Sequence, residues 1–142
     1  MRLLLSMLVL LLAGCSDKSA PPQDGGGGPA PGTFVGRARD RLCIAGEGRT
    51  LRAGLIVYGA KANTNCTGAG RLERSGANWA LTPGGEGACK FILTLTGDKV
   101  AIADAPASCS YYCGPGASLK GESFVRDVKA SRAVDFAGDP LC

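Results

Sequence analysis

Six cysteines spread over residues 43–142 constrain the fold more than any other feature of this sequence. They are Cys43, Cys66, Cys89, Cys109, Cys113 and Cys142. The chain has only one Trp, three Tyr and four Phe with which to build a core, and an even cysteine set in such a chain is typical of a disulfide framework. We expect three bridges, each stabilising the fold by ~2–4 kcal/mol. Six cysteines allow 15 pairings. Among these we favour Cys43 with Cys142, because a chain end stays ordered only when something holds it.

Two other uses of the cysteines fit their spacing less well. Cys109 and Cys113 are the one close pair, so the paired knuckles of a four-cysteine zinc site are missing. The same pair lacks the C-x-x-C spacing and the βαβ context of a redox motif. We therefore expect structural bridges, no metal site and no other cofactor.

The N-terminus carries the features of an export signal. Arg2 precedes an apolar run over residues 3–12, which is far shorter than the ~18 apolar residues that span a bilayer. The run ends in Leu12-Ala13-Gly14-Cys15. A transmembrane anchor or an ordinary signal peptide is the alternative, disfavoured by the length of the run and by the small residues that lead into a cysteine.

The Leu-Ala-Gly-Cys string resembles the lipobox of bacterial lipoproteins cleaved by signal peptidase II. The resemblance implies a lipoprotein signal peptide over residues 1–14 and acyl chains, palmitate among them, on Cys15. Several acyl chains give stable membrane anchoring. Ser16 replaces the aspartate of an inner-membrane retention signal, although Asp17 follows it. We therefore expect the protein to face the periplasm from the outer membrane.

Residues 15–35 are assigned to the lipidated cysteine and a disordered tether. The segment contains four consecutive glycines and several prolines without apolar periodicity, a composition that does not support a packed core. The remaining residues, 36–142, are few enough for one domain.

Short apolar stretches alternate with glycine-rich turns through this domain, which predicts an all-β fold. We expect a small disulfide-bridged antiparallel barrel or sandwich of about seven strands. The strand over residues 51–58 is apolar on both faces and is therefore predicted to be central. Residues 126–142 fit a short helix or an irregular segment equally well. The predicted strands are 41–45, 51–58, 66–74, 78–82, 89–96, 100–102 and 117–125.

Composition argues against catalysis and against nucleic-acid binding. The chain contains no histidine, which excludes Ser-His and Cys-His catalysis and histidine-bound zinc. The net charge of +4 is spread without a basic run, so no nucleic-acid partner is expected. A carboxylate pair for glycoside cleavage could in principle come from Glu73, Glu86 and Glu122, but sequence alone does not place them together.

Tyr111 and Tyr112, between Cys109 and Cys113 and ahead of Gly-Pro-Gly, form the most distinctive local string. Two tyrosines on a cross-linked loop are a candidate binding tip, since aromatic side chains dominate binding hot spots. The alternative is a structural role in which the rings cover the core. We expect that role for at least one of them.

The lipobox, tether and small cysteine-bridged β domain together resemble envelope lipoproteins such as the membrane-bound inhibitors of c-type lysozyme. The Ser-Gly-containing inhibitory loop of those proteins is absent here. The string over residues 109–119 is similar to a segment of small alphaproteobacterial lipoproteins without assigned activity. The first resemblance covers the architecture alone, and the second implies no activity. From the absence of histidine and of any catalytic motif we expect a monomeric, non-catalytic module that binds or inhibits an envelope protein or glycan. A structural envelope lipoprotein without a dedicated ligand is the alternative.

Overall fold

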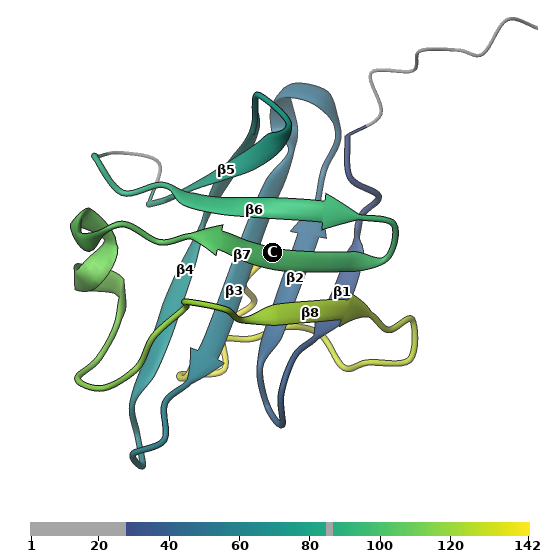
Figure 1. The fold of residues 1–142 in the computed structure, drawn as a ribbon. Helices are drawn as coiled ribbons and strands as arrows, with labels where there is room; N and C mark the ends of the chain where they lie inside the picture. The colour runs from purple at the N-terminus through teal and green to yellow at the C-terminus, as the bar shows by residue number, and fades with distance from the viewer. Residues whose placement is uncertain (1–27, 85–86) are drawn as a thin grey trace, which may run out of the picture.

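The computed structural model describes residues 28–84 and 87–142, which form a closed antiparallel barrel (Figure 1). Each strand pairs with the next one in sequence, and the last strand returns to pair with the first. The all-β, disulfide-bridged prediction is confirmed, and the structure is a barrel rather than a sandwich. The strands are β1 (Gly32–Val35), β2 (Arg41–Ala45), β3 (Arg52–Tyr58), β4 (Asn65–Ser75), β5 (Asn78–Pro83), β6 (Phe91–Thr96), β7 (Lys99–Asp104) and β8 (Ser123–Arg126). Two short 3₁₀ helices, η1 (Gly48–Thr50) and η2 (Ala107–Tyr112), lie in the loops.

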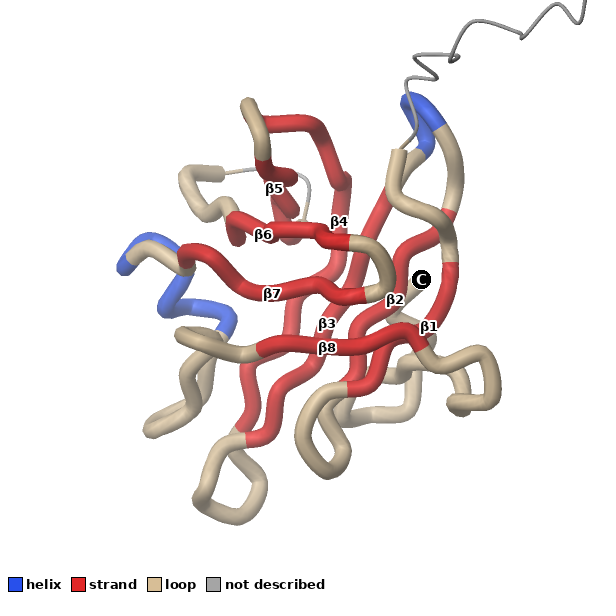
Figure 2. Tube along the Cα trace, turned by 45° about the vertical axis from the view of Figure 1, so that its right-hand side comes forward, coloured by secondary structure: helices blue, strands red, loops and turns tan. Residues whose placement is uncertain are grey.

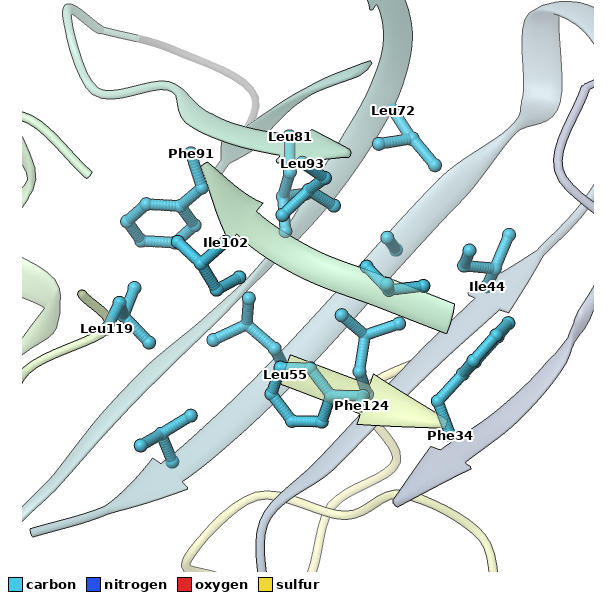
Figure 3. Packing of buried hydrophobic residues seen from close by; sticks show 14 of the residues in the cluster. Phe34, Ile44, Leu55, Leu72, Leu81, Phe91, Leu93, Ile102, Leu119 and Phe124 are labelled. Carbon is cyan, nitrogen blue, oxygen red and sulfur yellow. The ribbon is translucent and has the colours of Figure 1, made fainter. Parts of the chain in front are cut away.

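The inside of the barrel is filled by alternate side chains from its strands. Such filling is expected of an eight-stranded barrel, whose interior is just wide enough for side chains. Figure 3 shows Phe91, Leu55, Phe124 and Phe34 pointing inward from different strands. The surfaces open to a partner are therefore the ends and the outer wall of the barrel. The interior side chains include Phe34, Leu42, Ile44, Ala53, Leu55, Val57, Leu72, Leu81, Phe91, Leu93, Val100, Ile102, Leu119 and Phe124.

A second apolar cluster lies on the outer face of β2 and β3, beneath the C-terminal segment. Cys43 and Ile56 of the barrel wall are buried there against Ala133 and Leu141. Gly54 permits this contact, because a Cβ on it would lie 2.5–2.7 Å from the carbonyl oxygen and Cβ of Leu141. The apolar character of both faces of β3 is thus explained by two separate cores.

The C-terminal segment contains no helix, so the helical option for residues 126–142 is wrong. Its chain runs through turns with one isolated bridge between Val134 and Pro140. Val128 and Phe136, the bulky residues of the helical pattern, are exposed. The segment is irregular because it follows the outer wall of the barrel and is fastened there by its end.

Strand β1 begins the barrel four residues before the predicted start of the domain at Gly36. The prediction places residues 32–35 in the tether. Phe34 is nevertheless buried, and its strand pairs with β2 on one side and with β8 on the other. The Arg126 guanidinium holds the segment by donating to the carbonyl oxygens of Ala30 at 2.6 Å and Pro31 at 2.7 Å. The sequence did not predict this strand, because the Gly and Pro residues that directly precede it are typical of a tether.

The last predicted strand, residues 117–125, is largely a loop. Only Ser123–Arg126 forms a strand, and Leu119 instead enters the core from the loop at one end of the barrel. Leu119 is therefore buried because it covers that end of the barrel, and not because it belongs to a strand.

All six domain cysteines are paired, and the expected Cys43–Cys142 bridge is among the pairs. It closes a separation of 99 residues and fastens the C-terminal segment to β2. The other two bridges, Cys66–Cys113 and Cys89–Cys109, both involve the segment around η2.

Candidate functional site

The candidate binding tip is formed by η2 and the residues that follow it, between β7 and β8. Pro106 precedes the helix, and its carbonyl accepts a hydrogen bond from the amide of Cys109 at 2.8 Å. The amide of Cys113 donates to the carbonyl of Ser110 at 3.0 Å. These short-range bonds coil the chain tightly, so that the two tyrosines fall on the last turn.

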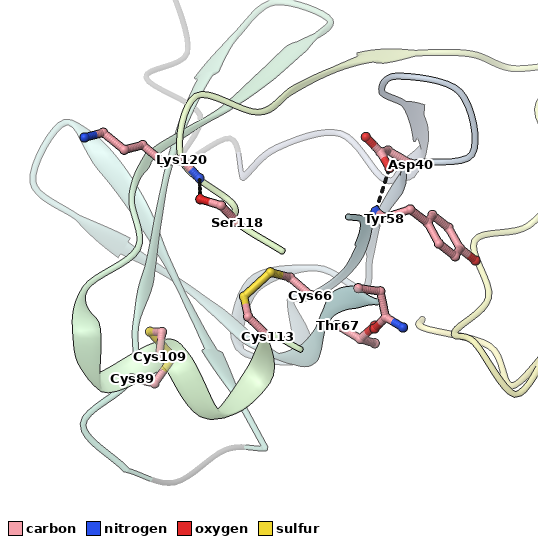
Figure 4. The surroundings of a disulfide bond; sticks show 10 residues. Asp40, Tyr58, Cys66, Thr67, Cys89, Cys109, Cys113, Ser118 and Lys120 are labelled. Carbon is pink, nitrogen blue, oxygen red and sulfur yellow. Dashed lines mark hydrogen bonds between the residues drawn. A yellow bond between two sulfur atoms is a disulfide. The ribbon is translucent and has the colours of Figure 1, made fainter. Parts of the chain in front are cut away.

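Two disulfides attach this tip to different parts of the barrel. Cys109 is bonded to Cys89, just before β6, and Cys113 is bonded to Cys66 in β4 (Figure 4). The amide of Gly114 adds a hydrogen bond of 2.8 Å to the carbonyl of Asn65. Because both ends of the turn are fixed, its side chains are presented with little loss of conformational freedom on binding.

Tyr112 is a structural residue of the tip. Its hydroxyl donates to the carbonyl oxygen of Pro83 at 3.0 Å. Its ring meets the buried Phe91 ring edge to face, with centroids 6.0 Å apart. Aromatic contacts of this geometry add to the stabilisation from burial.

Tyr111 has the opposite environment, because 89% of its surface is exposed. Its ring contacts Tyr112 edge to face at a centroid distance of 5.4 Å. The Tyr112 ring therefore supports the Tyr111 ring, and the Phe91 ring supports the Tyr112 ring in turn. The result is a large aromatic side chain held outward on a rigid support.

A small hollow of about 180 Å³ lies beside the tip. Phe91, Pro106 and Leu119 give it an apolar lining, and Ser110 and Lys120 add polar groups. An apolar hollow with a few polar groups suits a small group such as a peptide side chain, although neither Tyr111 nor Tyr112 is among the residues that line it.

Comparison with known protein families, curated sequences and solved structures finds no match to this chain. The resemblance to lysozyme-inhibitor lipoproteins therefore stays a prediction.

The remaining candidate residues are dispersed. Glu73 is paired with Arg71 on β4, whereas Glu122 is paired with Arg37. Glu86 and Cys15 lie outside the described residues. Within residues 28–84 and 87–142, no three potential metal-binding side chains come together. None of the helices in the described part of the chain has the length and apolar character needed to cross a membrane.

The sequence did not associate Phe91 or Pro83 with the tip. Both lie at least twenty residues before the tyrosines, and only the closure of the barrel brings them beneath η2. The Cys89–Cys109 pairing would have indicated their proximity, but spacing alone does not select it among the 15 alternatives.

Proposed function

We propose that the protein is an outer-membrane lipoprotein whose barrel acts as a non-catalytic binding or inhibitory module in the periplasm. The observation that carries the binding role is the exposure of Tyr111 on a turn fixed by two disulfides. Exposed aromatic anchors on rigid supports are favoured at binding hot spots. The partner proposed is an envelope protein or glycan that the ring contacts directly.

Tyr111→Ala tests this role. The full chain is immobilised, and the material it retains from the protein and glycan fractions of an envelope extract is compared with that retained by the variant. We expect retention to weaken roughly 30-fold, the equivalent of the ~2 kcal/mol typical of a hot spot. The melting temperature should barely change, because exposed side chains contribute within about 0.5 kcal/mol.

Val128→Ala is the matched control, because Val128 is equally exposed at 89% but belongs to the C-terminal segment. It should leave retention unchanged. Tyr112→Ala should instead lower the melting temperature, through loss of the Phe91 contact and the bond to Pro83. Equal retention by the parent and Tyr111→Ala would contradict the binding role and favour the structural alternative.

Lipid anchoring is tested separately at Cys15. Metabolic labelling with a palmitate analogue should mark the parent chain and fail to mark Cys15→Ala, which lacks the thiol that the acyl group requires. Cys15→Ser preserves the size and polarity of the site but also lacks the thiol, so it should remain unlabelled as well. Continued labelling of both variants would exclude Cys15 as the attachment point.

A further inference from the structure

Three arginines that are scattered in the sequence meet on one part of the barrel wall. Arg52 of β3 and Arg71 of β4 are directly opposite each other across the β3–β4 ladder. The amide of Leu72 donates to the carbonyl of Leu51, so the neighbouring Arg52–Arg71 position is a non-hydrogen-bonded pair of the ladder, with Cα atoms about 4.5 Å apart. Like charges directly opposite in a sheet are destabilising. An anion between the two guanidinium groups would relieve that repulsion.

Arg49 of η1 completes the group around an open hollow of about 340 Å³. We call this site the arginine hollow and define it by Arg49, Arg52 and Arg71. Its other lining residues carry no charge, and they are Thr50, Leu51, Ala69, Gly70 and Leu141. The three arginines are therefore the only charged residues that line the hollow in the described part of the chain.

Carboxylates of the described residues neutralise the arginine hollow only in small part. Arg71 contacts Glu73 at 3.3 Å, and both side chains are more than half exposed. Such exposed pairs contribute little. Arg49 and Arg52 form no ion pair within residues 28–84 and 87–142. Guanidinium groups bind phosphate oxygens in a bidentate geometry, so this group of arginines suits a phosphate.

The arginine hollow also lies close to the point where the chain joins the barrel. Gly28 approaches the side chain of Leu51, which lines the hollow, and a Cβ on Gly28 would lie 3.5 Å from it. Residues 28–31 and the loop before η1 line a neighbouring depression. Figure 2 shows η1 at the end of the barrel where the described chain begins. Residues 15–28 span at most roughly 3.6 Å each, so an anchor at Cys15 would keep this end within about 50 Å of the membrane.

We propose that the arginine hollow binds the phosphate group of an anionic membrane lipid and so docks this end of the barrel on the headgroups. The inference rests on the proposed lipid anchoring, which brings the hollow near the bilayer. Docking here would leave the Tyr111 tip available to a periplasmic partner. The disulfides attach that tip to Cys66 of β4 and to Cys89 just before β6.

The test follows the arginine side-chain Nε–Hε signals of the full chain by NMR in phosphatidylcholine bicelles, with and without phosphatidylglycerol. We expect Arg49, Arg52 and Arg71 to shift in proportion to the phosphatidylglycerol content. Each Arg→Ala substitution should weaken the apparent affinity about fivefold. The shifts should also decrease as salt is added, because exposed charges are screened.

The matched control is the triple variant Lys61→Ala, Lys90→Ala and Lys99→Ala, which removes the same charge from other exposed positions. It should retain the shifts, whereas Arg49→Ala, Arg52→Ala and Arg71→Ala combined should abolish the shifts of the backbone amides of Ala69 and Gly70, which line the hollow and are present in every variant. Equal shifts in bicelles without phosphatidylglycerol, or equal loss in the lysine variant, would overturn the proposal. Saturation by inorganic phosphate alone at the same concentration would assign the site to free phosphate instead.

Failure of this test is distinguishable from failure of the proposed function. The Tyr111→Ala chain retains the arginine hollow and should show the same shifts as the parent. If the chain proves to be unlipidated at Cys15 but its arginine signals still shift with phosphatidylglycerol, the lipid-binding site is supported and the proposed anchor is wrong.

Discussion

Replacing Cys43 and Cys142 together by Ala is expected to lower the free energy of unfolding by about 4–5 kcal/mol. The bridge spans 99 residues, and closing so long a loop removes the most conformational entropy from the unfolded chain. The same bridge holds Leu141 on the outer cluster against Gly54. Amide hydrogen exchange in residues 127–142 should therefore accelerate together with the loss of global stability, which denaturant unfolding measures.

The double variant of Cys89 and Cys109 is the comparison for this result. Its bridge spans only 20 residues, and the same entropy relation gives a smaller loss, about 3 kcal/mol. A larger loss from the short bridge than from the long one would show that loop closure does not govern the contribution of these disulfides.

Phe124→Ala should cost about 3–5 kcal/mol, the range found for truncating a fully buried phenylalanine. Phe124 is completely buried on β8, the strand that closes the barrel. That closure is narrow, because β8 pairs with β1 at only two positions, Phe34 with Arg126 and Val35 with Val125. The Phe124 ring also packs close to Gly36, where a Cβ would lie 3.0 Å from it. Thermal and denaturant unfolding would measure the loss.

Val125→Ala on the same strand is the control for Phe124→Ala. Val125 is 52% exposed and points away from the barrel interior, so its truncation should change stability by no more than about 0.5 kcal/mol. Similar losses for the two variants would mean that β8 contributes through its backbone ladder and not through the buried ring.

The two roles of the tyrosine pair follow from where each ring lies relative to Phe91. Adjacent residues on a 3₁₀ turn point in different directions, so only one of them can face the core. Tyr112 takes that position and its hydroxyl donates to the carbonyl oxygen of Pro83, so a structural role for this tyrosine stays the prediction that the melting temperature of Tyr112→Ala would test. Tyr111 is left exposed and supplies the contact surface on which the proposed binding role depends.

The strands of this chain could be predicted from local sequence wherever alternating apolar residues are followed by a clear turn. The strand Arg41–Ala45 matches its prediction, and a hairpin at Gly97 joins β6 to β7, between the predicted strands 89–96 and 100–102. Within the predicted strand 89–96, the alternate residues Cys89, Phe91 and Leu93 all lie in the core. Local signals suffice there because a strand buried on one face needs a period of two.

Tertiary structure decided the features that depend on contacts between distant residues. Thr33-Phe34-Val35 becomes a strand because β2 and β8 flank it, which the neighbouring Gly and Pro residues did not reveal. The pairing of Arg52 with Arg71 and the support of Tyr112 by Phe91 both arise from the order and register of strands around the closed barrel. A disulfide-bridged β domain could be predicted from the sequence, because apolar periodicity and the number of cysteines can be read without knowing which distant residues are in contact. Which side chains meet at its surface was fixed only by long-range strand pairing, and that is a property of the whole chain.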